Sequence, residues 1–210
     1  MSKDMWLPSG IVDCSNFKNS DITLDNLANL CYTQRAWSNV TSLNWPVSNH
    51  AYLSAIICAH LLRNDELSKE DKYRAIVITL LHDSEESFVT DIPTPFKSDE
   101  TRKVGDNIRN MIFDFLGVEG TGNDPDADRR DRRIKSVVEL ADIISLFWEI
   151  KHGYKHWESV GYECILTVLI TRCRKMIYFD IRITSIAETL KWVGINRSII
   201  DECTLWDELY

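Results

Sequence analysis

The chain has 210 residues, of which 44% are hydrophobic and 27% are charged, a composition ordinary for a globular protein with a substantial core. Its formal net charge of −8 excludes the fold-wide basic field that binds nucleic-acid polymers. No window approaches the roughly 18 apolar residues that span a bilayer, and no signal-like segment stands at the N-terminus. We therefore expect one cytoplasmic domain over residues 1–210, with no membrane partner.

Helical periodicity dominates the first half of the chain, after about 20 irregular residues. Asp21 or Thr23 is expected to cap a first helix that reaches about Arg35, and a second helix is expected over residues 48–64. Ser68-Lys-Glu-Asp71 resembles a capping box that opens a third helix. The predicted buried stripe of that helix consists of Tyr73, Ile76, Val77, Leu80 and Leu81.

The second half of the chain is also read as helical. Val104, Ile108, Met111, Ile112 and Phe115 form a stripe with a period near 3.6 residues, ended by Gly117. Residues 117–128 read as a flexible loop, and a long helix is expected over residues 131–152. Helical segments near 158–177, 182–193 and 197–208 complete an all-α bundle. The six cysteines form no C-x-x-C pair, so reduced thiols are expected.

One stretch, residues 82–97 with the sequence HDSEESFVTDIPTPFK, carries the clearest chemical signal. It places His82 and Asp83 side by side at the end of an apolar helix. Imidazole and carboxylate groups are ligands of divalent transition metals. His50 lies upstream in an apolar context and Asp142 lies downstream on a helix. Two imidazoles and two carboxylates would leave open positions for water and a substrate oxygen, so this set predicts metal-assisted phosphate hydrolysis.

Each of these residues also has a plainer interpretation. A single His on an apolar helix is more often a hydrogen-bonded core residue, which is the reading we give His60, His152 and His156. Asp142 alone fits a structural acid paired with an arginine. The four ligands taken together favour a metal. Of the nearby acids, Glu86 and Asp91 suit proton transfer, whereas Glu85 is expected to be solvated.

At these residues the sequence resembles the HD-domain phosphohydrolases, and more narrowly the bacterial 5′-deoxynucleotidase branch, which includes phage enzymes that remove triphosphate from dATP. The resemblance covers the His-Asp pair, Glu86, Asp91 and the Pro-Thr-Pro-x-Lys that follows. It also includes Arg35, which lies 15 residues before His50. It spans about residues 30–152, with the helices of residues 158–208 packing on that segment.

The resemblance implies a set of roles. His50, His82, Asp83 and Asp142 would bind one divalent metal, Co²⁺, Mn²⁺ or Zn²⁺, with Mg²⁺ an option for a triphosphate substrate. Arg35 and Lys97 would hold the phosphate, and Glu86 and Asp91 would assist proton transfer. Trp37 and Thr94 complete the implied substrate contacts.

Two departures from the branch affect selectivity. The branch often has Trp directly after the arginine, where it packs on the deoxyribose; this chain has Ala36 followed by Trp37. Three residues before the last ligand the branch usually has Lys, and this chain has Glu139. The four arginines 129, 130, 132 and 133 are read as a solvated, salt-bridging face.

The leading hypothesis is a metal-dependent hydrolase of 2′-deoxynucleotides, either a dATP triphosphohydrolase or a dNMP 5′-nucleotidase, with adenine as the expected base. One alternative is an HD phosphodiesterase acting on another nucleotide. A second alternative is a non-catalytic nucleotide-binding sensor. In each case the expected partner is a small nucleotide, and a homo-oligomer is expected from the family resemblance and from the many aromatic residues.

Overall fold

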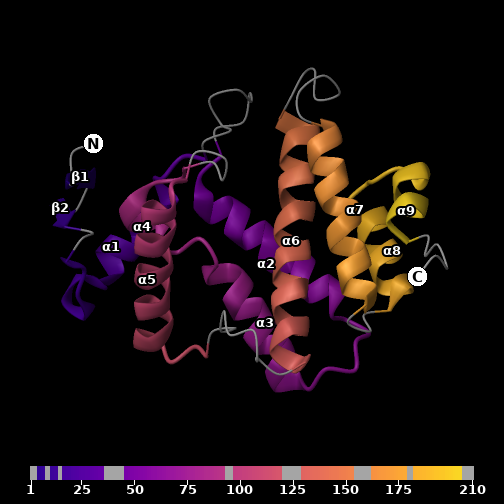
Figure 1. Ribbon diagram of the computed structural model, residues 1–210, viewed down its shortest axis with the longest axis horizontal. Coiled ribbons are helices and arrows are strands. Elements are labelled where there is room, and N and C mark those ends of the chain that lie inside the picture. Colours follow the sequence, from indigo (N-terminus) through magenta and orange to yellow (C-terminus); the bar gives the residue numbers. More distant parts are fainter. Residues whose placement is uncertain are drawn as a thin grey trace. The chain divides into compact units, whose positions relative to one another are not determined.

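The computed structural model describes residues 4–7, 10–13, 16–35, 45–92, 97–119, 129–153, 162–178 and 182–204. These residues are predominantly helical, which confirms the all-α fold class (Figure 1). The helices are α1 (Leu24–Ala28), α2 (Val47–Leu61), α3 (Lys69–Leu81), α4 (Glu86–Val89), α5 (Asp99–Phe115), α6 (Arg129–Gly153), α7 (Tyr162–Tyr178), α8 (Ile183–Trp192) and α9 (Arg197–Thr204).

The chain divides into two compact units. The first comprises Met1–Tyr52 and Leu80–Gly120, and the second comprises Leu53–Thr79 and Thr121–Tyr210. The single domain expected from the sequence stays a prediction.

The N-terminal part of the first unit departs from the predicted elements. Two short strands, β1 (Asp4–Leu7) and β2 (Gly10–Asp13), pair antiparallel where an irregular segment was expected. Thr23 caps α1 as predicted, since its Oγ1 accepts from the N–H of Asn26 at 3.1 Å. The expectation of one helix to Arg35 is wrong, because the chain passes from α1 into a 3₁₀ turn, Asn29–Cys31, and then into an extended segment.

The core of the first unit is built around Phe88 of α4, which is fully buried. Ile22, Ile108 and Ile112 pack with it, and the ring of Phe17 meets that of Phe88 edge-on at a centroid distance of 4.8 Å. The predicted stripe of α5 therefore faces this core, except that Phe115 at the helix end is exposed. This packing fixes the position of α4, and therefore also the position of its first residue, Glu86.

The second unit contains α6 to α9, and α6 and α7 run side by side (Figure 1). Val137, Ala141 and Ile144 of α6 are fully buried. Four cysteines of the described residues carry free thiols; Cys58, Cys173 and Cys203 are buried, and Cys31 is exposed.

The predicted buried stripe of α3 is wrong. The capping interaction is present, with the N–H of Asp71 donating to Ser68 Oγ at 3.0 Å. The buried residues of the helix, however, are Ala75, Ile78 and Thr79, whereas Tyr73, Val77 and Leu80 are exposed. Apolar residues occupy both sides of this helix, so their periodicity did not identify the buried side.

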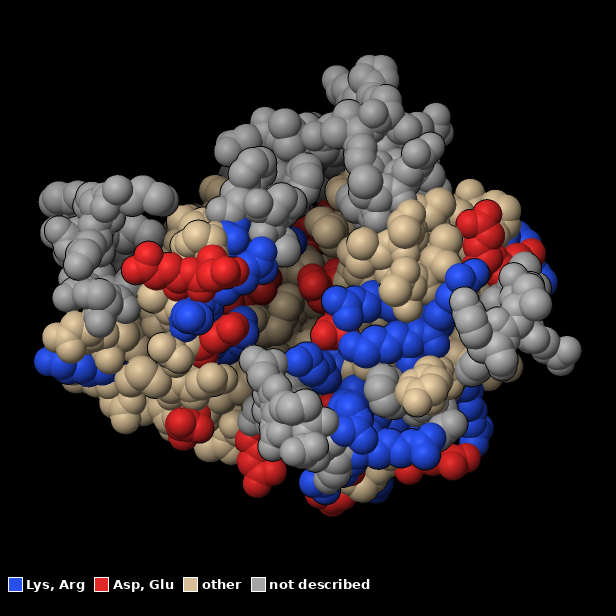
Figure 2. Space-filling model, viewed as in Figure 1, with Lys and Arg blue, Asp and Glu red and all other residues tan. Residues whose placement is uncertain are grey.

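Charged side chains of both signs occur together on the face shown in Figure 2. Two of the arginines at the start of α6 pair with acids of the same unit, Arg133 with Asp65 at 2.8 Å and Arg130 with Asp71 at 3.9 Å. This agrees with the salt-bridging interpretation of the arginine cluster. Among the described residues, no helix is long and apolar enough to cross a membrane.

Replacing Phe88 with Ala should destabilise the protein by about 3–5 kcal/mol, because the change leaves a cavity in the core of the first unit. Urea unfolding of the metal-free protein measures this. Replacing the exposed Phe115 of α5 with Ala is the matched control, and it should cost much less. Equal costs for the two variants would contradict the described packing.

Candidate metal centre

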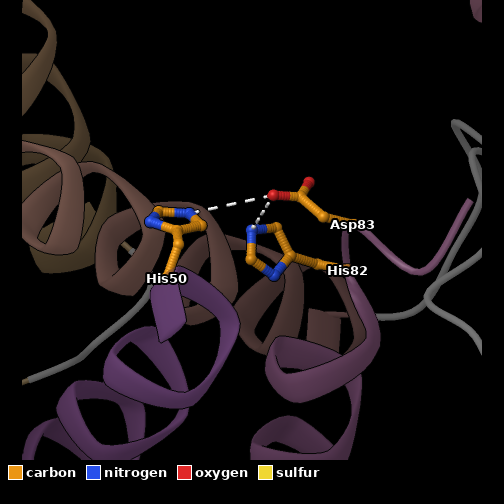
Figure 3. A group of neighbouring side chains, drawn as sticks. All are labelled: His50, His82 and Asp83. Atoms are coloured by element: carbon orange, nitrogen blue, oxygen red, sulfur yellow. Dashed lines mark ion pairs between the residues drawn. The ribbon is translucent and has the colours of Figure 1, made fainter. Parts of the chain in front are cut away.

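Three side chains of the first unit point toward one another (Figure 3). His50 lies in the first turn of α2 and is fully buried. His82 and Asp83 follow directly after Leu81, the last residue of α3. Each of the three residues offers one ligand atom, and these atoms all lie within 4.8 Å of one another. The structure therefore brings these three predicted residues together.

One of the two distances from Asp83 matches the donor spacing around a divalent ion, and the other exceeds it by a few tenths of an ångström. Asp83 Oδ2 lies 3.3 Å from His82 Nε2 and 3.8 Å from His50 Nε2. Ligand bonds of about 2.0–2.2 Å to zinc place neighbouring donor atoms roughly 3–3.5 Å apart. Two imidazole nitrogens and one carboxylate oxygen also form a donor set that transition metals favour. These three residues can therefore hold a metal ion.

The ending of α3 brings the adjacent residues into one site. The N–H of Ser84 donates to the Leu81 carbonyl at 3.0 Å, and the N–H of Glu86 donates to the Asp83 carbonyl at 3.0 Å. Residues 82–85 thus form turns between α3 and α4. The sequence placed His82 and Asp83 on the last turns of the helix, where adjacent side chains diverge by about 100°. In the turn, both side chains reach the same point.

Arg35 lies beside this carboxylate. Its Nη1 is 3.3 Å from Asp83 Oδ2 and 3.7 Å from Asp91 Oδ2. The extended segment before α2 places it there, because the N–H of Arg35 donates to the Trp45 carbonyl at 3.0 Å and the N–H of Val47 donates to the Thr33 carbonyl at 2.8 Å. These backbone bonds explain why the first helix ends early.

Glu86 and Lys97 form a second charged pair near the centre. Lys97 Nζ lies 3.4 Å from Glu86 Oε1, and the Glu86 side chain is 2% exposed. Burial raises the pKa of Glu86 to about 10, and the negative charges of Asp83 and Asp91 add to this effect, while Arg35 and Lys97 oppose it. Burial therefore favours the protonated form of Glu86, the form in which a general acid acts.

Glu85 is not solvated, and the expectation that it would be is wrong. Its side chain is 5% exposed and its Oε1 accepts from Arg109 Nη1 at 2.7 Å. Burial raises the pKa of Glu85 to about 7, against the opposing charge of Arg109. Gly105, one turn before Arg109, was the available signal in the sequence. A glycine inside a helix often marks a place where another group packs closely against the helix, and here that group is the Glu85 side chain.

Thr90 holds a conformation that normally belongs to glycine. It ends α4 with φ 64° and ψ 159°, a region that costs a β-branched residue about 1–3 kcal/mol. The next residue is Asp91, whose side chain is 7% exposed and pairs with Arg35. The strain therefore falls at the bend that turns Asp91 toward the centre.

The remaining predicted residues do not belong to this group of three ligands. Asp142 lies in the second unit on α6, half-buried between Ala141 and Ile143, and its role as fourth ligand stays a prediction. Trp37 and Thr94 lie outside the described residues. Glu139 is held in the second unit by Lys175 at 2.9 Å and by Arg172.

The helical fold, the adjacent His-Asp pair and the second His converging on it are the features expected of an HD-domain phosphohydrolase. Residues 24–111 match the model of the family described as YfbR-like, 5′-deoxynucleotidase YfbR-like. The resemblance to the 5′-deoxynucleotidase branch of the HD-domain phosphohydrolases is therefore confirmed over this segment of the chain. The segment holds each predicted site residue except Asp142. Comparisons with curated proteins and with solved structures find no match.

Replacing Thr90 with Gly should stabilise the metal-free protein by about 1 kcal/mol, because glycine removes the strain at positive φ and its own entropy cost offsets only part of that gain. Urea unfolding at neutral pH measures the change. The control is Lys103→Gly on the exposed side of α5, which should destabilise by somewhat under 1 kcal/mol. A loss of stability in the Thr90→Gly protein would refute the strain.

Proposed function

We propose that this protein is a metal-dependent phosphohydrolase of 2′-deoxynucleotides. The observation that carries the proposal is the convergence of His50, His82 and Asp83 on one point, within the segment that matches a 5′-deoxynucleotidase family. Cations and acids surround that point, which suits a phosphate ester and the proton transfers of its hydrolysis.

His50, His82 and Asp83 would hold one divalent ion, Co²⁺, Mn²⁺ or Zn²⁺, with Asp142 proposed as the fourth ligand. When bound, such an ion polarises a phosphoryl oxygen and lowers the pKa of a coordinated water. The protein's part is to set the donor atoms in place before the ion arrives. The turn after α3 positions His82 and Asp83, and the first turn of α2 positions the buried His50.

Arg35 and Lys97 are the proposed phosphate-binding residues. Arg35 offers a planar fork that matches two phosphoryl oxygens, and Lys97 adds a compact charge. Both now contact carboxylates, at 3.3 Å to Asp83 and 3.4 Å to Glu86. An incoming phosphate would accept hydrogen bonds from Arg35 and Lys97, which Asp83 and Glu86 already hold in position. Little rearrangement of these side chains would then be needed.

Glu86 and Asp91 are the proposed proton-transfer residues. Burial and the neighbouring acids raise the pKa of Glu86, which favours its protonated form. It can therefore donate to the oxygen of the leaving group, as general acids do. Asp91, paired with Arg35, is placed to accept a proton or to orient the attacking water.

The substrate is a small deoxynucleotide, either a dNMP that releases phosphate or dATP that releases triphosphate. Mg²⁺ is an option with the triphosphate. Trp37 and Thr94 are proposed substrate contacts, and we propose a cytoplasmic homo-oligomer. In the described part of the chain, the group named above is the one set of side chains placed to hold a metal ion. That observation favours a single-metal monoester or triphosphate hydrolase over a two-metal phosphodiesterase.

Replacing Asp83 with Ala should reduce deoxynucleotide hydrolysis to background, because the carboxylate oxygen that both imidazoles face is lost. The assay follows chromatographically resolved products from each dNMP, dNTP and ribonucleotide, with Co²⁺, Mn²⁺, Zn²⁺ or Mg²⁺. Asp114→Ala, an exposed acid at the end of α5, is the matched control and should retain full activity.

The outcomes separate the hypotheses. Deoxynucleoside with triphosphate from dATP identifies a triphosphohydrolase, and phosphate from dNMPs alone identifies a nucleotidase. Full activity of the Asp83→Ala protein would refute the proposed metal site. Tight nucleotide binding by the wild type without turnover under any metal would instead establish the sensor alternative.

A further inference from the structure

Arg109 of α5 makes a contact that none of the proposed catalytic roles uses. Its Nη1 donates to the backbone carbonyl of His82 at 3.3 Å and to Glu85 Oε1 at 2.7 Å. Asp106, one turn earlier on the same helix, accepts from Nη2. One guanidinium thus joins α5 to both ends of the turn between α3 and α4.

That turn carries the proposed ligands. Residues 82–85 lie between two helices, with His82 and Asp83 at its start and Glu85 at its end, directly before Glu86. Arg109 therefore bonds the backbone of the proposed ligand His82 and also the side chain of Glu85, which precedes the proposed acid Glu86. Displacement of this turn would change both the donor positions and the direction of Glu86.

Glu85 also packs against α5 close to Arg109. A Cβ placed on Gly105 would lie 3.4 Å from Glu85 Cγ, which is van der Waals contact. Breaking a buried charge pair by removing one partner leaves the other charge without compensation. Loss of Arg109 would therefore leave the carboxylate of Glu85, which is 5% exposed, without its cation. The turn would then be held less firmly.

We propose that Arg109 is a positioning residue that fixes the His82–Glu85 turn for metal binding. The proposal rests on the metal site of the proposed function. Its basis is that Nη1 donates both to the His82 carbonyl and to Glu85, while Asp106 holds Nη2 of the same planar group. A lysine keeps the charge but has one nitrogen, so it cannot bond the turn and Asp106 from two fixed positions.

The test measures the affinity of the metal-free protein for Co²⁺ and Mn²⁺ by calorimetry, beside its stability in urea. Arg109→Ala should weaken metal binding by about 10–100-fold, the usual cost of losing a residue that orients a metal ligand. Arg109→Lys should fall between this variant and the wild type. Lys103→Ala, an exposed cation on the same helix, is the control and should bind metal as the wild type does.

A second variant separates positioning from general stability. Glu85→Gln combined with Arg109→Ala removes the stranded charge and should recover much of the lost stability. Metal affinity should nevertheless stay low, because the His82 carbonyl still lacks its donor from α5. Full recovery of metal affinity together with stability would overturn the proposal and leave Arg109 as a purely structural residue.

Chemical rescue gives a third readout. Glu85 and Arg109 line a cavity of about 210 Å³ that also borders Lys97, so a small cation can reach the space left by truncation. Millimolar guanidinium should raise the metal affinity of the Arg109→Ala protein and leave that of Lys103→Ala unchanged. Failure of guanidinium to raise it would count against the proposed bond to the turn.

The controls also distinguish two kinds of failure. A wild type that binds neither Co²⁺ nor Mn²⁺ would refute the proposed metal site, and the role of Arg109 with it. A wild type that binds metal, beside an Arg109→Ala protein that binds it equally well, would refute the role of Arg109 alone.

Discussion

The site depends on where α3 stops. Two adjacent residues on a continuous helix point about 100° apart, so they would direct their donors to different sides. Ending the helix at Leu81 places His82 and Asp83 in a turn, where Asp83 Oδ2 lies 3.3 Å from His82 Nε2. The buried His50 completes the group from the first turn of α2. The surrounding contacts serve to keep this turn in one conformation.

Burial gives the charges around the turn their chemical character. Glu85 and Glu86 both have pKa values raised by burial, and each has a cation in contact, Arg109 and Lys97 respectively. Pairing of this kind makes buried acids tolerable. The two neighbours nevertheless face different partners. Glu86 shares Lys97 with the region where phosphate would bind, whereas Glu85 ties the turn to α5.

The sequence predicted the chemistry of the site better than its shape. The residue types and spacing of His50, His82, Asp83 and Arg35 indicated one centre, and the described ligands do converge. The break after Leu81 was missed, because the apolar pattern runs on toward the histidine. Glu85 was misread as solvated, since its partner Arg109 is distant in sequence. Tyr73 and Val77 were misread as buried, because α3 has apolar residues on both sides.

Titration of the stripped protein with metal shows whether hydrolysis depends on a bound ion. Protein stripped with a chelator would receive Co²⁺ or Mn²⁺ in small steps, with product release from a deoxynucleotide followed at each step. We expect negligible activity without metal, a rise in proportion to the added ion, and a plateau at about one ion per chain. Activity that is undiminished in the stripped protein and indifferent to added metal would contradict the account.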